Sequence, residues 1–328
     1  MDSAEWSFDG WPEGKVADAI EHVINCVWTA RDRDEVVWIG DDLQTRRVLG
    51  DWSLWSLFSP DAPIRLSPEL RQELAAWLGS ARCYLDEEQW PPGMEETYIR
   101  VDQNLPEENS DQAWAHHHVR SGRPVACLSL RRSGPHSTVS ALGSATVHWI
   151  VDESTHRAFW RDAIEVERGG TEPLERLSAH AFPDLHFHTA VWQGLNNFAG
   201  GYLAVRRELQ RYLTVLDQHG VWAFTFPPPA LALGEAAGSD PSVLPSNQIV
   251  ERRFHGLNLD ISPENSNVRA DNNCRRAREI TLGTQTLYCE WHGKLERHQN
   301  RIYMHPPVPA SKGKVVIAIF TDHLPLPT

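Results

Sequence analysis

The sequence predicts an α+β protein: a mixed amino-terminal body joined by a linker rich in Pro, Gly and Ala to a small module of two helices and an antiparallel sheet. Apolar residues recur at helical spacing in some segments and alternate in others. A segment without Lys or Arg interrupts this pattern, and the charge balance differs on its two sides. We expect the body at residues 1–225, the linker at 226–247 and the module at 248–328.

The composition is that of an ordered chain long enough for about two domains. Of its 328 residues, 41% are hydrophobic, 23% are charged and 14 are Trp. The acidic start MDSAEWSFDGWPEG lacks the apolar run of a secretory signal. The longest apolar run, VVIAIF, is far shorter than the ~20 residues that span a bilayer. We therefore expect a cytoplasmic protein without a membrane partner, whose 5 scattered cysteines are reduced thiols.

The body reads as alternating helices and strands. Val16, Ile20, Val23 and Val27 share one helical face, and Ser67 caps a helix that begins with Pro68. Helices are expected at 15–28, 67–80, 153–165, 173–180 and 201–219. Strands are expected at 35–40, 97–101 and 124–130, and as a hairpin of 137–142 with 145–151 that turns near Gly143 and Ser144.

The segment FPPPALALGEAAGSDPSVLPSN at 226–247 has the composition of a linker. Beyond it, QIVERRF and NVRADNNCRRAREI are helical candidates. The segments TQTLYCEWHGKL, RIYMH and GKVVIAIFTDH then predict a three-stranded antiparallel meander. The carboxyl-terminal piece is therefore expected to be helix, helix and sheet.

Charge is distributed unevenly along the chain. The whole sequence carries 31 Lys and Arg against 44 Asp and Glu, a net charge of -13. Residues 248–328 contain 11 basic and 8 acidic residues, hence +3, whereas the remainder has 20 and 36, hence -16. Such asymmetry suits a carboxyl-terminal piece that meets a polyanion, although a short segment also acquires such an excess by chance.

Alternation in the first two strands of the meander places polar side chains on a shared face. If Lys294 pairs with Arg301, the same register sets His292 opposite Tyr303 and Glu290 opposite His305. Two opposed cations normally destabilise a sheet, so an anion such as phosphate between them would compensate. A shift of one residue would send these side chains to the other face.

Histidines, a tyrosine and cations on one surface are what metal-free RNA cleavage requires. A base accepts the proton of the 2′-hydroxyl, an acid protonates the leaving oxygen, and cations stabilise the phosphorus centre. The candidates for acid or base are His292, His305 and His323, with Tyr303 stacking or hydrogen bonding. The candidates for phosphate binding are Lys294, Arg297 and Arg301. No metal or cofactor is expected.

Other interpretations of these residues remain open. The polar face could simply be the solvated side of an antiparallel sheet or a protein-binding face, and Glu290 would repel phosphate. The run of histidines at 116–118 is interpreted as surface or interface histidines, because consecutive side chains cannot all reach one metal. His186 and His188 share a strand face but lack a placed third ligand, and Cys289 with His292 lacks a second pair.

Familiar catalytic signatures are absent from the sequence. It contains no GxxxxGK[ST], no GxGxxG and no GxSxG. The spacing of Glu290 and Lys294 does not reproduce the D…ExK pattern of metal-dependent nucleases, which disfavours a restriction-type nuclease.

Two resemblances add to this reading. The run from SPENSNVRADNNC to FTDHLPL, with AWAHHHVRSGRPVACLSL and HAFPDLHFH upstream, resembles a bacterial family of uncharacterised proteins over most of the chain. The element order of residues 248–328 also resembles RelE-type toxin ribonucleases, a likeness of fold without a diagnostic motif.

We therefore expect a RelE-like module that binds RNA, with metal-free ribonuclease activity as its candidate reaction, regulated by the acidic body in a toxin- or defence-like role. The alternative is a non-catalytic interaction subunit of a bacterial defence or stress complex, in which the many Trp residues serve cores and interfaces. A DNA-binding regulator is disfavoured by the negative charge and the lack of a helix-turn-helix pattern.

Overall fold

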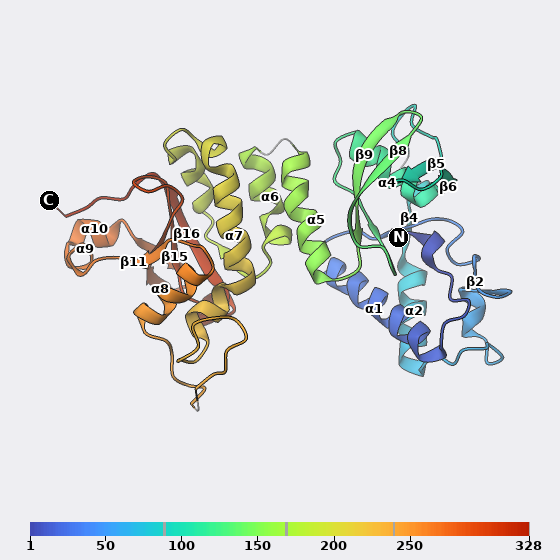
Figure 1. The fold of residues 1–328 in the computed structure, drawn as a ribbon, viewed down its shortest axis with the longest axis horizontal. Coiled ribbons are helices and arrows are strands. Elements are labelled where there is room, and N and C mark those ends of the chain that lie inside the picture. The colour runs from blue at the N-terminus through green and yellow to red at the C-terminus, as the bar shows by residue number, and fades with distance from the viewer. Residues whose placement is uncertain (88–89, 168–169, 239, 328) are drawn as a thin grey trace. The chain divides into compact units, whose positions relative to one another are not determined.

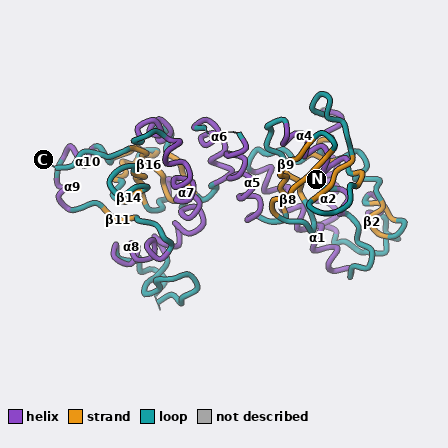
Figure 2. Tube along the Cα trace, turned by 45° about the horizontal axis from the view of Figure 1, so that its top comes forward, coloured by secondary structure: helices purple, strands orange, loops and turns teal. Residues whose placement is uncertain are grey.

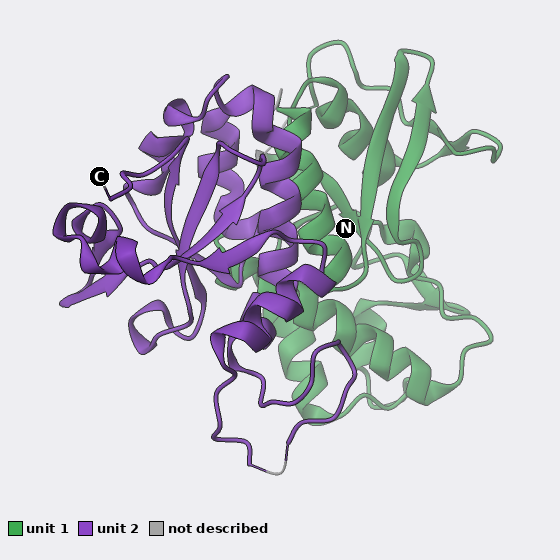
Figure 3. Cartoon of the chain, turned by 60° about the vertical axis from the view of Figure 1, so that its left-hand side comes forward, with its two compact units in different colours: residues 1–168 green, residues 169–328 purple. Residues whose placement is uncertain are grey.

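The protein has an α+β fold, here described from a computed structural model that covers all residues except 88–89, 168–169, 239 and 328. The chain divides into two compact units, Met1–Arg168 and Gly169–Thr328 (Figure 3). Each unit is described by itself.

Unit 1 combines helices at its beginning and end with a sheet in its second half (Figure 1). Its helices are η1 (Ser3–Glu5), α1 (Glu13–Asp32), η2 (Trp55–Phe58), α2 (Pro68–Ser80), α3 (Tyr84–Glu87), α4 (Ser110–Arg120) and α5 (Glu153–Val166). Its strands are β1 (Trp38–Ile39), β2 (Arg47–Leu49), β3 (Trp52–Ser53), β4 (Arg82–Cys83), β5 (Tyr98–Val101), β6 (Glu107–Glu108), β7 (Ala126–Leu128), β8 (Gly134–Ser140) and β9 (Gly143–Ile150).

The predicted elements of unit 1 are largely confirmed. The apolar stripe of α1 is buried, and Ser67 Oγ accepts a hydrogen bond from Leu70 N at 3.1 Å as the cap of α2. β8 and β9 form the predicted hairpin within a five-stranded sheet of order β6-β5-β8-β9-β7, although Ser140 pairs with Gly143, so the turn comes at Ala141 and Leu142. The strand expected at 35–40 is reduced to β1, which pairs in parallel with β4.

Unit 2 is built around a second five-stranded sheet (Figure 1). Its helices are α6 (Thr171–Ala181), η3 (Val191–Asn197), α7 (Tyr202–Thr225), α8 (Asn247–Gly256), α9 (Ser266–Ala270), α10 (Asn272–Arg276) and η4 (Pro309–Ser311). Its strands are β10 (Leu185–Phe187), β11 (Ile261–Pro263), β12 (Glu279–Leu282), β13 (Gln285–Tyr288), β14 (Trp291–Lys294), β15 (Arg301–His305) and β16 (Val315–Thr321).

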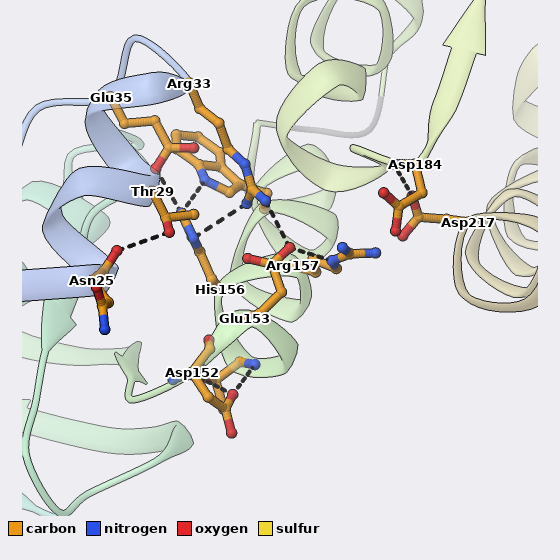
Figure 4. Close-up of polar contacts among 12 residues, drawn as sticks. Asn25, Thr29, Arg33, Glu35, Asp152, Glu153, His156, Arg157, Asp184 and Asp217 are labelled. Atoms are coloured by element: carbon orange, nitrogen blue, oxygen red, sulfur yellow. Dashed lines mark hydrogen bonds and ion pairs between the residues drawn. The ribbon is translucent and has the colours of Figure 1, made fainter. Parts of the chain in front are cut away.

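The predicted antiparallel meander is present as β14-β15-β16, but it is the centre of a larger sheet. The strand order is β10-β16-β15-β14-β11, with β10 parallel to β16 and β11 antiparallel to β14. The long helix α7 covers one face. A Cβ added at Gly293 would lie 2.9 Å from the ring of Tyr212, so only glycine permits this close approach. The start of β10 is also tied to α7, because Asp184 N donates to Asp217 Oδ1 at 2.7 Å (Figure 4).

The expected linker forms a loop within unit 2 over its described residues 226–238 and 240–246, and it does not join the two units. Figure 2 shows it as a loop between α7 and α8, and the units divide instead at residues 168 and 169. The expectation placed the junction too late because the composition of a long surface loop equals that of a linker. The strand β10, which precedes the loop, belongs to the same sheet as the strands that follow it. The helix α7, which also precedes the loop, packs on that sheet.

The segment TQTLYCEWHGKL does not form one strand. It breaks at Cys289 and Glu290 into β13, which pairs with β12 in a separate hairpin, and β14, which joins the five-stranded sheet. The helical candidate NVRADNNCRRAREI likewise becomes the two short helices α9 and α10 followed by β12. Because Asp271 stands between the helices with extended backbone and caps α10, its side chain ends one helix and starts the next.

Within the residues that the structure describes, none of the helices combines the length and the apolar character needed to cross a bilayer.

Candidate functional site

The predicted pairing of the first two meander strands is confirmed. His292 lies opposite Tyr303 and Lys294 opposite Arg301. Directly opposed residues share a face of a sheet, so the four side chains belong to one face. The rings of His292 and Tyr303 are 5.7 Å apart between centroids. The register does not extend to Glu290, which stands in the break between β13 and β14.

This face is not an open solvated surface, as one interpretation of the sequence held. Tyr303 is 1% exposed and packs in an apolar cluster with Leu287 and Cys289, with Leu324 against it. The β12–β13 hairpin and the segment after β16 therefore cover the centre of the face, and a backbone hydrogen bond from Leu324 reaches the Tyr303 hydroxyl. Only side chains toward the margin of this cover, such as His292, remain in contact with solvent.

The cations predicted to hold phosphate are placed differently from one another. Arg301 is 6% exposed, and its Nη1 donates to the carbonyl oxygens of Glu296 at 3.0 Å and Gln299 at 2.9 Å. Arg301 thus satisfies the carbonyls of the β14–β15 turn through Nη1, and its role as a phosphate ligand stays a prediction. Lys294 is partly exposed and forms an ion pair with Asp260, Nζ to Oδ1 3.0 Å.

The remaining predicted residues do not gather at His292. The Nδ1 atom of His305 is 2.8 Å from the carbonyl oxygen of Pro306, and that of His323 is 2.7 Å from the carbonyl oxygen of Leu324. Arg297 lies exposed in the β14–β15 turn. In the part of the chain that the structure describes, none of the three takes part in the hydrogen bonds or ion pairs around His292.

Instead, the structure brings Glu264 and Arg278 to His292. The Arg278 side chain is fully buried, and its Nε donates to Glu264 Oε1 at 2.7 Å. Its Nη1 donates to the carbonyl oxygens of Cys274 at 2.9 Å and Pro325 at 3.1 Å. The same Glu264 oxygen lies 3.8 Å from His292 Nδ1, too far for a hydrogen bond but close for a charge interaction.

Sequence reasoning missed both residues. Glu264 follows β11 and Arg278 precedes β12, both outside the strand pair whose alternation could be followed. One signal was available, because Arg278 stands four residues after the buried Cys274 and so falls on the apolar side of the expected helix.

The electrostatics keep His292 neutral at pH 7. Burial lowers its pKa to about 4; Glu264 works in the opposite direction, while Lys294, Arg301 and Arg278 lower it further. Burial also raises the pKa of Tyr303. A neutral imidazole can accept a proton, whereas it cannot serve as the acid at neutral pH.

Three buried polar atoms in this cluster have no hydrogen-bond partner among the described residues. They are Nδ1 of His292, Nη2 of Arg278 and the hydroxyl of Tyr288. Buried polar atoms are nearly always hydrogen-bonded in folded proteins, so this concentration distinguishes the cluster from ordinary core. We call Glu264, Arg278, Tyr288, His292 and Tyr303 the polar cluster.

No group of His, Cys, Asp and Glu among the described residues has the geometry of a metal site. Burial raises the pKa of Cys289 to about 12, so this thiol stays protonated and is a poor ligand. His116 and His117 are buried in α4, where their ring nitrogens lie 2.8 Å from Thr138 Oγ1 and 3.0 Å from the Glu96 carbonyl oxygen. Our expectation of surface or interface histidines at 116–118 is therefore wrong: the rings are core groups.

No family model, no curated protein and no solved structure matches this chain. The likeness to RelE-type toxins and to an uncharacterised bacterial family accordingly stays a prediction.

Proposed function

We propose that unit 2 binds RNA and that His292 acts as the general base in its metal-free cleavage. The observation that supports this is that His292 lies near both the Tyr303 ring and the Glu264 carboxylate, with Lys294 two residues further along the same strand. An imidazole flanked by a carboxylate, with a cation on the same face, has the parts that removal of a hydroxyl proton requires.

The reaction would proceed through Nε2 of the His292 ring. Nδ1 faces Glu264, so Nε2 takes the 2′-hydroxyl proton, and the carboxylate stabilises the imidazolium that forms. The 2′-oxygen attacks phosphorus, the bond to the 5′-oxygen breaks, and a 2′,3′-cyclic phosphate and a 5′-hydroxyl result. The leaving oxygen takes its proton from water, and Lys294 faces the charge on the phosphate.

The charge of the molecule bears on how RNA would bind. Unit 1 holds 16 basic and 29 acidic residues, the whole excess of -13, whereas unit 2 holds 15 of each. Of the 11 basic residues at 248–328, Arg253, Arg278 and Arg301 are buried. Binding would therefore depend on local cations such as Lys294, and the acidic unit 1 would act as the regulator or docking unit of the proposal.

The test is cleavage of end-labelled cellular RNA by the full chain, with and without EDTA. We expect cleavage that resists EDTA, yields cyclic phosphate ends and falls at least about a hundredfold in His292→Ala, since general bases contribute factors of this order. His298→Ala, in the exposed β14–β15 turn, is the matched control and should cleave normally.

Glu264→Gln adds a second measurement, because it removes the charge beside Nδ1 while keeping the shape of the side chain. We expect reduced cleavage, with folding checked by circular dichroism. A folded wild-type chain that neither binds nor cuts RNA would refute the proposal.

The second candidate function is a non-catalytic interaction subunit. It is favoured by the many internal bonds of the site, since Arg278 and Arg301 bind backbone carbonyls and so serve the fold. Cleavage that is unchanged in His292→Ala would come from a contaminant. The non-catalytic interaction subunit would then be the better account.

A further inference from the structure

A serine and a histidine of unit 1, which the proposed RNA cleavage does not use, are hydrogen-bonded to each other. The ring of His116, on α4, lies between two hydroxyls of β8: its Nδ1 is 2.8 Å from Thr138 Oγ1, and its Nε2 is 3.2 Å from Ser140 Oγ. Helix α4 packs on the β8–β9 hairpin and so holds the ring against the strand (Figure 1). Because Thr138 and Ser140 are two residues apart in β8, their side chains share the face that meets α4.

The hydrogen bonds around His116 set the position of its proton. The hydroxyl of Thr138 donates to the carbonyl oxygen of Ala145 at 3.2 Å, and a carbonyl oxygen can only accept. The Thr138 oxygen therefore accepts the proton of His116 Nδ1, which leaves Nε2 with an electron pair for the hydroxyl proton of Ser140. A serine that donates to an imidazole, while a third group orients the ring, has the arrangement of an activated nucleophile.

The ring of His116 is neutral at pH 7. Burial, with smaller contributions from His117 and Arg120, lowers its pKa to about 4. Nε2 can therefore accept a proton without first losing one. The same surroundings make an imidazolium unfavourable, so the reaction requires that a negative charge form beside it in the same step.

Arg120 provides a cation on the face that carries Ser140. It follows His116 by four residues and so lies on the same side of α4. Ser140 pairs directly with Gly143, and a Cβ added at Gly143 would lie 3.0 Å from Arg120 Nη2 and 3.1 Å from its Nε. Because directly opposed residues point to one side of a sheet, the guanidinium lies beside the Ser140 side chain.

Both Arg120 and Ser140 are available for a ligand. Arg120 forms no ion pair or side-chain hydrogen bond with the residues that the structure describes, and its Nη1 is buried. Such buried donors nearly always have a partner in folded proteins. Ser140 is half-buried and is followed by the exposed Ala141 and Leu142. Leu142 N donates to Ser140 Oγ at 3.1 Å, which leaves one electron pair of the oxygen for attack on a substrate.

We propose that Ser140 is the nucleophile of a site that hydrolyses carboxylic esters, with His116 as its base and Arg120 as the group that receives the oxyanion. The site lies within unit 1, and its activity does not depend on the proposed RNA cleavage by unit 2.

The reaction has two steps. Nε2 of His116 takes the hydroxyl proton while Ser140 Oγ attacks the carbonyl carbon, and the carbonyl oxygen gains the electron pair beside Arg120. The bond to the alcohol oxygen then breaks, and this oxygen takes the proton from Nε2. In the second step Nε2 takes a proton from water as the water oxygen attacks the acyl-serine, and Ser140 Oγ recovers that proton as the carboxylic acid leaves.

The first test is labelling of the full chain with an alkyl fluorophosphonate, followed by mass spectrometry of its peptides. The serine oxygen bonds to phosphorus, fluoride leaves, and the hydroxyl proton goes to the base. We expect Ser140 to be labelled at least about a hundredfold faster than Ser137, since a general base contributes a factor of this order. Ser137 is an exposed serine on the other face of the same strand.

Variants assign the roles. His116→Asn should slow the labelling of Ser140 by about a hundredfold, because the base is lost. Ser140→Ala should abolish the hydrolysis of 4-nitrophenyl acetate by the full chain. Arg120→Gln should slow this hydrolysis by about a hundredfold, the usual effect of removing one oxyanion donor. Arg100→Gln, which removes an exposed arginine on β5 of the same sheet, is the matched control and should change neither measurement.

The comparison of two serines on the unchanged chain keeps the proposal testable even if His116→Asn fails to fold, which circular dichroism would show. Equal labelling rates at Ser140 and Ser137 would overturn the proposal. So would unchanged labelling in folded His116→Asn, or ester hydrolysis that persists in Ser140→Ala. An unchanged rate of hydrolysis in Arg120→Gln would overturn the role of Arg120.

Discussion

Two arginines of unit 2, Arg253 and Arg278, are both fully buried, yet their surroundings differ in kind. The hydrogen bonds of Arg253 all go to backbone carbonyls, and its guanidinium lies over the Trp222 ring at 5.1 Å. Its Nε donates to the carbonyl oxygen of Ala230 at 2.8 Å, and its Nη1 donates to those of Phe226 at 2.9 Å and Ala223 at 3.1 Å. It therefore joins α8 to the carboxyl end of α7, where the helix dipole favours a cation.

Arg278 is surrounded partly by side chains. It bonds to Glu264, stacks over the Tyr303 ring at 5.3 Å and leaves Nη2 without a partner among the described residues. The difference teaches that burial alone does not separate a structural cation from a functional one. Arg253, hydrogen-bonded only to backbone carbonyls, holds the fold, whereas Arg278, paired with a carboxylate and carrying an unpartnered nitrogen among the described residues, is part of the site that we propose.

The largest effect on stability is expected at Arg253, whose hydrogen bonds all go to backbone carbonyls. Arg253→Met should lower the free energy of unfolding by about 4 kcal/mol, because several buried carbonyls lose a charged donor at once. Chemical denaturation measures this. Arg252→Met, the exposed neighbour on α8, should change it by less than about 0.5 kcal/mol. A small effect of Arg253→Met would show that water replaces the guanidinium.

A somewhat smaller effect is expected at the polar cluster. Arg278→Met should cost about 3 kcal/mol, because it leaves the Glu264 carboxylate buried without its cation. The double variant with Glu264→Gln should be more stable than the sum of the two single effects predicts, by about 1 kcal/mol or more. Strict additivity in this cycle would mean that the two side chains do not act as a pair.

Both arginines also show what the sequence could and could not predict. In ERRF and CRRAR they counted as surface charge, and together with Arg301 they account for the +3 balance of residues 248–328. Apart from the bond of Arg278 to Cys274, their hydrogen bonds go to carbonyls and a carboxylate between 14 and 47 residues away in the chain. No local sequence pattern predicts contacts between residues so far apart. Composition therefore predicted the positive net charge of the segment but not which of its arginines are buried.

The strand pairing was predictable for the opposite reason. Alternation and a short turn are local, and they set His292 opposite Tyr303 and Lys294 opposite Arg301 correctly. The long helices were predictable because α1 and α7 carry apolar residues at helical spacing. The cover of the sheet was not, because a break at Cys289 and Glu290 diverts β13 into a separate hairpin, and alternation continues through that break.

The smallest of the expected effects concerns His292 and depends on pH. Its pKa in the folded chain is lowered to about 4 by burial, below the ordinary value of 6.5, so between these values the unfolded chain binds more protons. The contribution of the neutral His292 to the free energy of unfolding is complete above about pH 6.5 and is lost as the pH decreases toward 4. From pH 7 to pH 4.5 this group should account for a loss of about 2 kcal/mol.

Denaturation of the wild-type chain and of His292→Asn at both pH values isolates this contribution. His116, whose pKa burial also lowers to about 4, destabilises both chains equally at low pH and cancels in the difference. The variant should thus lose about 2 kcal/mol less than the wild type. Equal losses would mean that His292 is solvated in the folded state. The polar cluster would then be open to water, in contrast to the buried surroundings of Arg253.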